Sequence, residues 1–288
     1  MRLAFSFLER AAPAIGARWA ERIWFRLPRT TTRSALARLA PSGDPGQRFT
    51  IRVGGTDVVG GTWGGEGPVV YLLHGWAGHR GQLEAFAPGL VRRGFRVVAF
   101  DAPSHGESGP GAYGPRSSSI PEFADALTAV IARHGPAAGI VAHSLGSVAA
   151  AIALCDGLRA GRVAMIAPMA SPASHARHFA RILGFGPRTL ARLTRRVERR
   201  VGAPMHHFDV PEIGRAVQMP PTLIVHDRAD RSVPVADGIA IAEAWPTARL
   251  HVTSGLGHRR LLREPEVIGA VLDFMDAGID RREPRPAG

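Results

Sequence analysis

Lysine is absent from this 288-residue chain and cysteine occurs once, so all 36 basic residues are arginines and no disulfide can form within the chain. A single cysteine, Cys155, is typical of a protein from a reducing compartment. Long apolar runs are also missing near the N-terminus, where the run from Leu3 to Leu8 is too short for a signal peptide. We therefore expect a cytoplasmic protein.

Acidic residues are too few to balance the arginines, and the formal net charge is +12. The excess is concentrated in residues 1–38, with eight Arg against two Glu, and in residues 172–203, with eight Arg against one Glu. The remainder of the chain is nearly neutral, and no helix-turn-helix, zinc-finger or RNP pattern accompanies the charge. We interpret the arginine content as a coding bias and expect no nucleic acid as a partner.

Residues 1–47 are predicted to form an amphipathic helical arm, interrupted near Pro13. Apolar side chains recur there at steps of four, with Arg and Glu between them: Leu3, Phe7, Ala11, Ile15, Trp19, Ile23 and Leu27. This pattern favours helices packed on the protein's own body. Two alternatives stay open, which are peripheral contact with the inner face of a membrane and contact with a second copy of the chain.

From residue 48 onward, short apolar segments alternate with helical patterns, which predicts an α/β protein with a mostly parallel, eight-stranded, doubly wound sheet. The predicted strands are 48–53, 57–63, 68–74, 95–101, 139–144, 162–168, 221–227 and 248–253. The predicted helices are 81–93, 120–134, 145–156, 235–244 and 261–277. Because Gly54-Gly55 joins the first two strands, they should form a hairpin.

Residues 169–219 interrupt this alternation and are predicted to be an inserted helical cap, which divides the core into 48–168 and 220–288. Two amphipathic helices are expected in the cap, at about 174–184 and 188–201. The arginines of the second helix lie off its apolar stripe, so we expect them to face solvent. An apolar stripe that faces inward would shape a hydrophobic acyl pocket.

The strongest local signal is the segment Gly139-Ile-Val-Ala-His143-Ser144-Leu145-Gly146, an apolar strand that runs into a turn of small residues and then a helix. A serine in such a turn exposes its hydroxyl at the edge of the sheet. Crowding of the backbone requires small residues two positions before and two after it, which are here Ala142 and Gly146. Ser144 is therefore the candidate nucleophile.

A serine hydroxyl needs a base to take its proton, and the base needs an acid to orient it. Asp230 and His258 follow the last two predicted strands, at the strand ends where functional groups of such a sheet gather. The order Ser144, Asp230, His258 is the one expected for nucleophile, acid and base from successive strand ends. Asp227 is the rival acid, because it ends the strand itself.

Taken together, four segments resemble those of α/β-hydrolase fold serine hydrolases of the esterase and lipase type, over roughly residues 48–277. These segments are His74-Gly75-Trp76-Ala77-Gly78, Asp101 to Ser108, Ala142 to Gly146, and Asp230 to Pro234 with His258. The resemblance implies that Ser144 is the nucleophile, Asp230 the orienting acid and His258 the general base. Ala142 departs from the family pattern, which usually has glycine there.

The same resemblance implies that the backbone N–H groups of Trp76 and Leu145 form an oxyanion hole. His74, Gly75 and His143 adjoin these groups and are predicted substrate-binding residues. The alternative for His143 is packing beside the pocket, and the alternative for His74 is support of the oxyanion loop through a hydrogen bond.

Acyl transfer is the chemistry that such a site implies, and hydrolysis of a carboxylic ester with a small or medium acyl group, lipase-like or lysophospholipase-like, is the leading hypothesis. A thioesterase or acyltransferase that uses the same three residues is the second, and a non-catalytic binding protein on this fold is the third. The expected partner is a small acyl substrate. We expect no metal or organic cofactor, because the pairs His175/His178 and His206-His207 lack a closed set of ligands.

Overall fold

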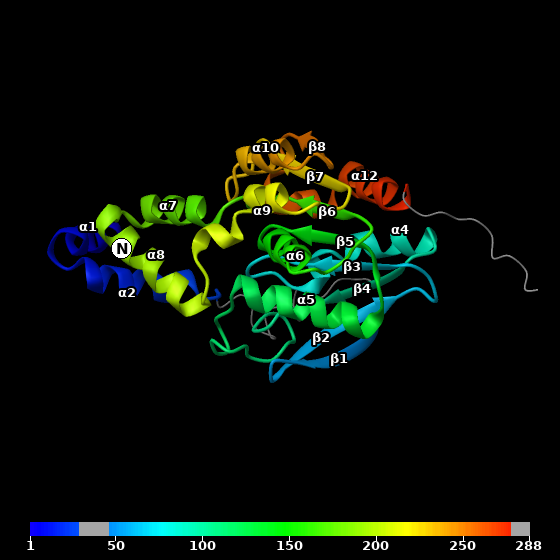
Figure 1. Ribbon diagram of the computed structural model, residues 1–288, viewed down its shortest axis with the longest axis horizontal. Coiled ribbons are helices and arrows are strands. Elements are labelled where there is room, and N and C mark those ends of the chain that lie inside the picture. The colour runs from blue at the N-terminus through cyan, green and yellow to red at the C-terminus, as the bar shows by residue number, and fades with distance from the viewer. Residues whose placement is uncertain (29–45, 278–288) are drawn as a thin grey trace, which may run out of the picture.

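An eight-stranded sheet forms the centre of the computed structural model, which describes residues 1–28 and 46–277 (Figure 1). The strands are β1 (Gln47–Val53), β2 (Thr56–Trp63), β3 (Val69–Leu73), β4 (Arg96–Phe100), β5 (Ala137–His143), β6 (Val163–Ile166), β7 (Thr222–Asp227) and β8 (Ala248–Thr253). Their order is β1-β2-β4-β3-β5-β6-β7-β8. β2 pairs antiparallel with β1 and with β4, and the other neighbours pair parallel. The predicted mostly parallel sheet with an initial hairpin is confirmed.

The central strands are buried on both faces because helices cover both sides of the sheet. In β3, Val70 and Leu72 belong to the hydrophobic cluster of one face, and Tyr71 and Leu73 to that of the other. The Tyr71 face is covered by α5 (Ile120–His134), α6 (Leu145–Cys155), α9 (Val210–Ala216) and α10 (Val235–Ala244). The Val70 face is covered by η3 (Glu84–Phe86), α4 (Ala87–Arg92), η5 (Leu261–Arg263) and α12 (Pro265–Asp276).

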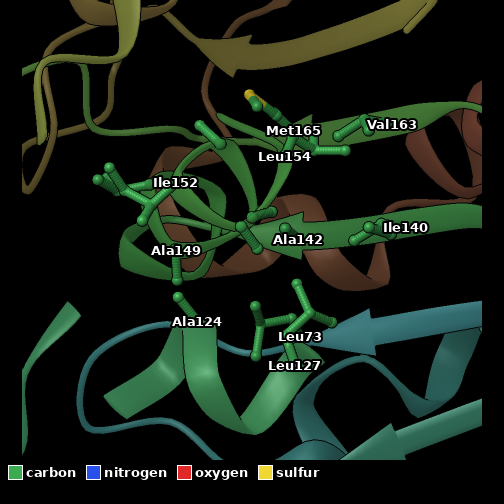
Figure 2. Packing of buried hydrophobic residues seen from close by; sticks show 14 of the residues in the cluster. Leu73, Ala124, Leu127, Ile140, Ala142, Ala149, Ile152, Leu154, Val163 and Met165 are labelled. Carbon is green, nitrogen blue, oxygen red and sulfur yellow. The ribbon is translucent and has the colours of Figure 1, made fainter. Parts of the chain in front are cut away.

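The packing between the sheet and α6 fixes the place of the candidate nucleophile, since Ser144 lies between β5 and α6. Side chains of β3, β5 and β6 meet those of α5 and α6 in one continuous core (Figure 2). Ala142 and Ala149 are fully buried there. Small side chains therefore let α6 lie close to the strand from which it emerges.

Two predicted helices are shorter than their apolar patterns suggested. The segment 81–93 is divided into η2 (Arg80–Gln82), η3 and α4, and Pro88 lies in the first turn of α4 because it has no N–H for an interior position. The segment 261–277 begins with a 3₁₀ turn, and α12 starts only at Pro265, again in the first turn of a helix.

The arm and the insertion together form one helical layer beside the sheet, at the left of Figure 1. It contains α1 (Arg2–Ala11), α2 (Pro13–Trp24), α7 (Pro172–Leu183), α8 (Pro187–Val201) and η4 (Met205–Phe208), and we call this layer the cap. The cap has its own hydrophobic cluster, in which Phe5 stacks on Trp19 with ring centroids 4.6 Å apart and lies 5.3 Å from Phe185. The arm therefore packs on the protein's own body.

The predicted insertion differs from this layer at α9. Helix α9 falls within the predicted insertion 169–219, yet Val210 and Ile213 pack into the core of the sheet beside α6 and α10. Residues 29–45 of the predicted arm and residues 278–288 of the predicted second core segment lie outside the described residues.

The predicted inward stripe of the arm is wrong at several positions. Leu3, Phe7 and Ile15 are exposed, whereas Phe5 and Ala20 are fully buried. Steps of four drift by about 40° around a helix at each step, and the chain bends at Ala12 between α1 and α2. Residues spaced by four across that bend therefore do not all lie on the inward face of the two helices.

Carboxylates of the arm bind the inserted helices. Glu9 accepts hydrogen bonds from the backbone N–H groups of Arg188 (2.9 Å) and Thr189 (3.0 Å) in the first turn of α8. Glu21 pairs with Arg196, and its other oxygen lies 3.9 Å from Arg200. Within the described ranges, no helix has the length and hydrophobicity needed to cross a bilayer.

We predict that Glu9→Ala lowers the free energy of unfolding by about 1 kcal/mol, because the first N–H groups of α8 lose the carboxylate that accepts their hydrogen bonds. Burial raises the pKa of the Glu9 carboxyl, but the hydrogen bonds from Thr189 and Arg188 outweigh burial and bring the pKa below 4.5. The stability that the ionised Glu9 contributes is therefore present above pH 4.5 and is lost as the pH falls through the lowered pKa. Urea unfolding at neutral and acidic pH measures it.

The matched control is Glu243→Ala, which removes an exposed carboxylate from α10. Its unfolding free energy should stay within about 0.5 kcal/mol of the wild type. If the Glu9 variant and this control are equally stable at neutral pH, the hydrogen bonds from α8 to Glu9 contribute nothing to the free energy of unfolding.

Candidate active site

Ser144 occupies a strained turn between β5 and α6. Its φ of 53° and ψ of −120° are rarely adopted by residues with a side chain. The turn needs small neighbours, because a Cβ on Gly146 would lie 2.5 Å from the carbonyl oxygen of His74, and a Cβ on Gly75 would lie 2.9 Å from the Cβ of Ser144. Ala142 is accommodated in β5, where it is fully buried.

The structure brings together the three residues that the sequence predicted. His258 lies in the short helix α11 (Gly257–Arg260), after β8. Its Nε2 is 3.1 Å from the hydroxyl oxygen of Ser144, and its Nδ1 is 2.7 Å from Oδ2 of Asp230, which follows β7. An imidazole held between a hydroxyl and a carboxylate can take a proton from the one while the other orients it.

The Asp230 carboxylate is held in place through its other oxygen. Oδ1 accepts hydrogen bonds from the backbone N–H groups of Ser232 (2.8 Å) and Val233 (2.9 Å), which leaves Oδ2 for His258. Burial raises the pKa of Asp230, but His226, whose Nε2 lies 3.6 Å from Oδ2, and the hydrogen bond from His258 outweigh burial and hold the pKa well below its ordinary value. Asp230 is therefore an anion at neutral pH.

Asp227, the rival acid, binds the loop before His258 and not its imidazole. Its carboxylate accepts hydrogen bonds from four groups: Ala229 N (2.9 Å), Thr253 Oγ1 (2.8 Å), Leu256 N (3.1 Å) and Gly257 N (2.9 Å). Asp227 is therefore placed to position α11, which carries His258.

The residues predicted to bind substrate, His74, Gly75 and His143, are buried, and none of them lines the cavity beside Ser144. Nε2 of His74 accepts a hydrogen bond from the Ala102 N–H at 3.0 Å, and its Nδ1 lies 2.8 Å from the Gly75 carbonyl oxygen. Burial lowers the pKa of His74 to about 3. Its contacts support the loop that leads to Trp76.

His143 has a structural contact that sequence reasoning missed. Its Nε2 lies 3.0 Å from the backbone carbonyl oxygen of His258, so Nε2 carries the proton and donates it. Burial lowers the pKa of His143 to about 3, which keeps the ring neutral. Its position next to Ser144 was visible in the sequence, but its partner was not, because the two residues are far apart in the chain.

The two residues predicted to supply the oxyanion hole, Trp76 and Leu145, line the same cavity as Ser144. Leu145 is the first residue of α6, so its N–H has no partner within the helix. Within residues 1–28 and 46–277 the Trp76 N–H has no hydrogen-bond partner either. The following residue, Ala77, has a φ of 56° and donates its own N–H to His105 Nε2 at 3.1 Å.

The cavity beside Ser144 has a volume of about 420 Å³ and an apolar wall. The cap supplies much of that wall, including Trp24, Phe25, Phe179, Val197, Met205 and Phe208. Among the described residues, the one Arg, Asp or Glu in the wall is Arg259, which belongs to the core. The cap arginines therefore do not line the cavity. On α8, four of them are exposed to solvent as predicted, whereas Arg196 and Arg200 are half-buried beside Glu21 of α2. No group of three or more His, Cys, Asp or Glu in the described ranges is arranged to hold a metal ion.

Comparisons with known proteins agree with this architecture. Residues 68–206 match the family model described as alpha/beta hydrolase fold. A hydrolase from Pseudomonas aeruginosa has a TM-score of 0.62 at 22% identity, over 81% of this chain and 99% of that one. An esterase from Exiguobacterium antarcticum has a TM-score of 0.59 at 17% identity, over 78% of this chain and 98% of that one.

A third match is local. It is 50% identical to a pimeloyl-[acyl-carrier protein] methyl ester esterase of Methylococcus capsulatus over 44 residues, which is 15% of this chain and 17% of the length of that esterase. The family model and the solved structures cover far more of the chain, and they agree on the fold. This chain has the α/β-hydrolase fold.

Proposed function

We propose that the protein is a serine hydrolase that cleaves carboxylic esters with small or medium apolar acyl groups, through an acyl-enzyme at Ser144. The observation that carries the proposal is the hydrogen-bonded series Ser144–His258–Asp230 at the wall of an apolar cavity. The esterase names among the similar proteins support an ester as the bond that is cleaved.

In the first half of the reaction, the Ser144 hydroxyl attacks the ester carbonyl while its proton passes to Nε2 of His258. The imidazolium that forms is stabilised by the Asp230 carboxylate at Nδ1. The proton then moves from Nε2 to the leaving alcohol, which departs and leaves the acyl group on Ser144. In the second half, water attacks the acyl group on Ser144 while His258 takes its proton. His258 then returns the proton to the Ser144 oxygen, and the carboxylic acid is released.

The oxyanion of each tetrahedral intermediate is proposed to bind the backbone N–H groups of Trp76 and Leu145. Removal of one such donor typically costs about 3–4 kcal/mol of transition-state stabilisation. This is the proposed reason why the Trp76 loop is fixed by His74 and His105, which hold its backbone from behind.

The apolar wall of the cavity favours a neutral, hydrophobic acyl group over a charged one, because a buried charge without a partner is costly. A lipase-like or lysophospholipase-like ester, with its acyl chain against Phe179 and Met205 and its polar part toward solvent, satisfies this constraint.

We predict that Ser144→Ala lowers kcat/KM for a soluble aryl ester by at least about 10⁴-fold, because no hydroxyl remains to form the acyl-enzyme. Initial rates of alcohol release measure the effect. Ser254→Ala, which removes an exposed hydroxyl after β8, is the matched control and should keep wild-type activity. Equal activity of the two variants would eliminate Ser144 as the nucleophile.

Substitution of Asp230 and of Asp227 by asparagine should affect different properties of the protein. Asp230→Asn should lower kcat by about 10⁴-fold, because the imidazolium of His258 loses its carboxylate. Asp227→Asn should mainly lower thermal stability, because its two carboxylate oxygens accept four hydrogen bonds, which join the end of β7 to the end of β8 and to the start of α11. Steady-state kinetics and a thermal melt of each variant measure this. The assignment fails if Asp227→Asn has the larger kcat loss at unchanged stability.

A series of aryl esters from acetate to dodecanoate should show kcat/KM rising by about fourfold per methylene until the cavity is full, since each buried methylene contributes about 0.8 kcal/mol. Ala203→Trp, at the cavity wall, should move the maximum to a shorter chain. Ala191→Trp, on the exposed side of α8, is the control and should leave the maximum unchanged. A profile that is flat with chain length contradicts an acyl group in this cavity.

A further inference from the structure

Exposed large apolar side chains are concentrated at one end of the cap. Among the described residues, six such side chains are exposed: Met1, Leu3, Phe7, Ile15, Ile182 and Ile239. Only Ile239 belongs to the core, on α10. We call Leu3, Phe7, Ile15 and Ile182 the cap tip; their exposed fractions are 87%, 68%, 56% and 54%. Helix α1, which carries the first two, lies at the end of the molecule farthest from the sheet (Figure 1).

Helix α1 has apolar side chains on two faces, and only one of these faces is buried within the described part of the chain. Phe5 points into the cap core and is fully buried. Leu3 and Phe7 are one turn apart, on the opposite side of the helix, and face solvent. Exposed apolar side chains gathered in one place mark an interaction surface, whereas single ones scattered over a protein are ordinary.

The surroundings of the cap tip are positively charged. Six arginines of α1, α2 and α7 are exposed, and none forms an ion pair within residues 1–28 and 46–277: Arg2, Arg10, Arg18, Arg22, Arg177 and Arg181. The carboxylates that could neutralise them are engaged elsewhere. Glu9 accepts from the first turn of α8, Glu21 pairs with Arg196, and Glu198 accepts the Met205 N–H at 3.1 Å.

We propose that the cap tip docks on an anionic lipid bilayer, with its apolar side chains in the interface and the surrounding guanidinium groups at the lipid phosphates. Apolar side chains flanked by cations are the pattern of helices that lie in a membrane surface. The same charge disfavours a second copy of this chain as the occupant, because two such surfaces would bring their unpaired arginines together. Nucleic acid would leave Leu3 and Phe7 without an apolar partner.

The docked surface is joined to the cavity by a single helix. Helix α2 carries Ile15 at its first turn, in the cap tip, and Ile23 and Trp24 at its last turn, in the cavity wall. The rise of an α-helix over that span is about 13 Å. The proposed bilayer contact and part of the cavity wall therefore lie on the same helix, which suits an ester substrate that comes from the bilayer. This step rests on the proposed function, whereas the docking itself does not.

The test is sedimentation of the full chain with vesicles of phosphatidylcholine alone, or of phosphatidylcholine with phosphatidylglycerol, at low and high salt. The wild type should bind the anionic vesicles at least about tenfold more tightly, and added salt should weaken the binding. Leu3→Ser/Phe7→Ser should bind them about tenfold more weakly. Ile239→Ser, which removes an exposed apolar side chain from the core and is closest in size of change to Ile182→Ser, is the control and should bind like the wild type.

Three checks keep the outcome decisive. Ile182→Ser, on α7, tests the same surface if the double variant does not fold, and it should also weaken binding. Hydrolysis of a soluble ester without vesicles should be unchanged in both variants, because neither changes the cavity wall. Ser144→Ala should bind vesicles like the wild type, so a failure of the proposed hydrolysis would not affect this test.

The proposal is overturned if the wild type does not sediment with anionic vesicles, or if the cap-tip variants bind them as well as Ile239→Ser does. It is also overturned if the wild type forms a dimer in size-exclusion chromatography that Leu3→Ser/Phe7→Ser converts to a monomer. In that case a second copy of the chain covers the cap tip.

Discussion

The hydrogen bonds from Asp230 through His258 to Ser144 can form only if three strand ends meet at one edge of the sheet. β5, β7 and β8 run parallel, so their carboxyl ends lie at the same edge, and each of the three residues follows one of them. The strained turn at Ser144 then raises its hydroxyl above β5, and Asp227 fixes the loop before α11. Most buried polar contacts near the site serve this alignment.

The cap depends on a second constraint, which is that short amphipathic helices need partners to bury their apolar faces. Helices α1 and α2 find theirs on α7 and α8, which lie more than a hundred residues later in the chain. The result is a layer that closes the cavity with Trp24 and Phe179 on one side and leaves the cap tip on the other. One helical layer therefore supplies both a wall of the cavity in which the acyl group is proposed to bind and the proposed membrane surface.

Most of the sheet and the triad could be predicted because their signals are local. β5 is continuously apolar, the small residues around Ser144 meet a steric need of the turn itself, and chain order places Asp230 and His258 at strand ends. The misjudged features depend on long-range contacts. Phe5, on the inward face of α1, contacts Phe185 as well as Trp19 of α2, and His143 contacts the carbonyl oxygen of His258. Phe185 and His258 are both far in sequence from the residues that they contact.

The central claim is that Ser144 is the hydroxyl that becomes covalently modified, because among the described residues it alone lies 3.1 Å from Nε2 of an imidazole that a buried carboxylate orients. Treatment with a fluorophosphonate, followed by proteolysis and mass spectrometry of the peptides, tests this most directly. The account predicts a phosphonyl adduct on the peptide that spans β5 and α6, with fragment ions that locate it at Ser144. An adduct on a different serine, or an intact enzyme that hydrolyses esters without forming any adduct, would contradict it.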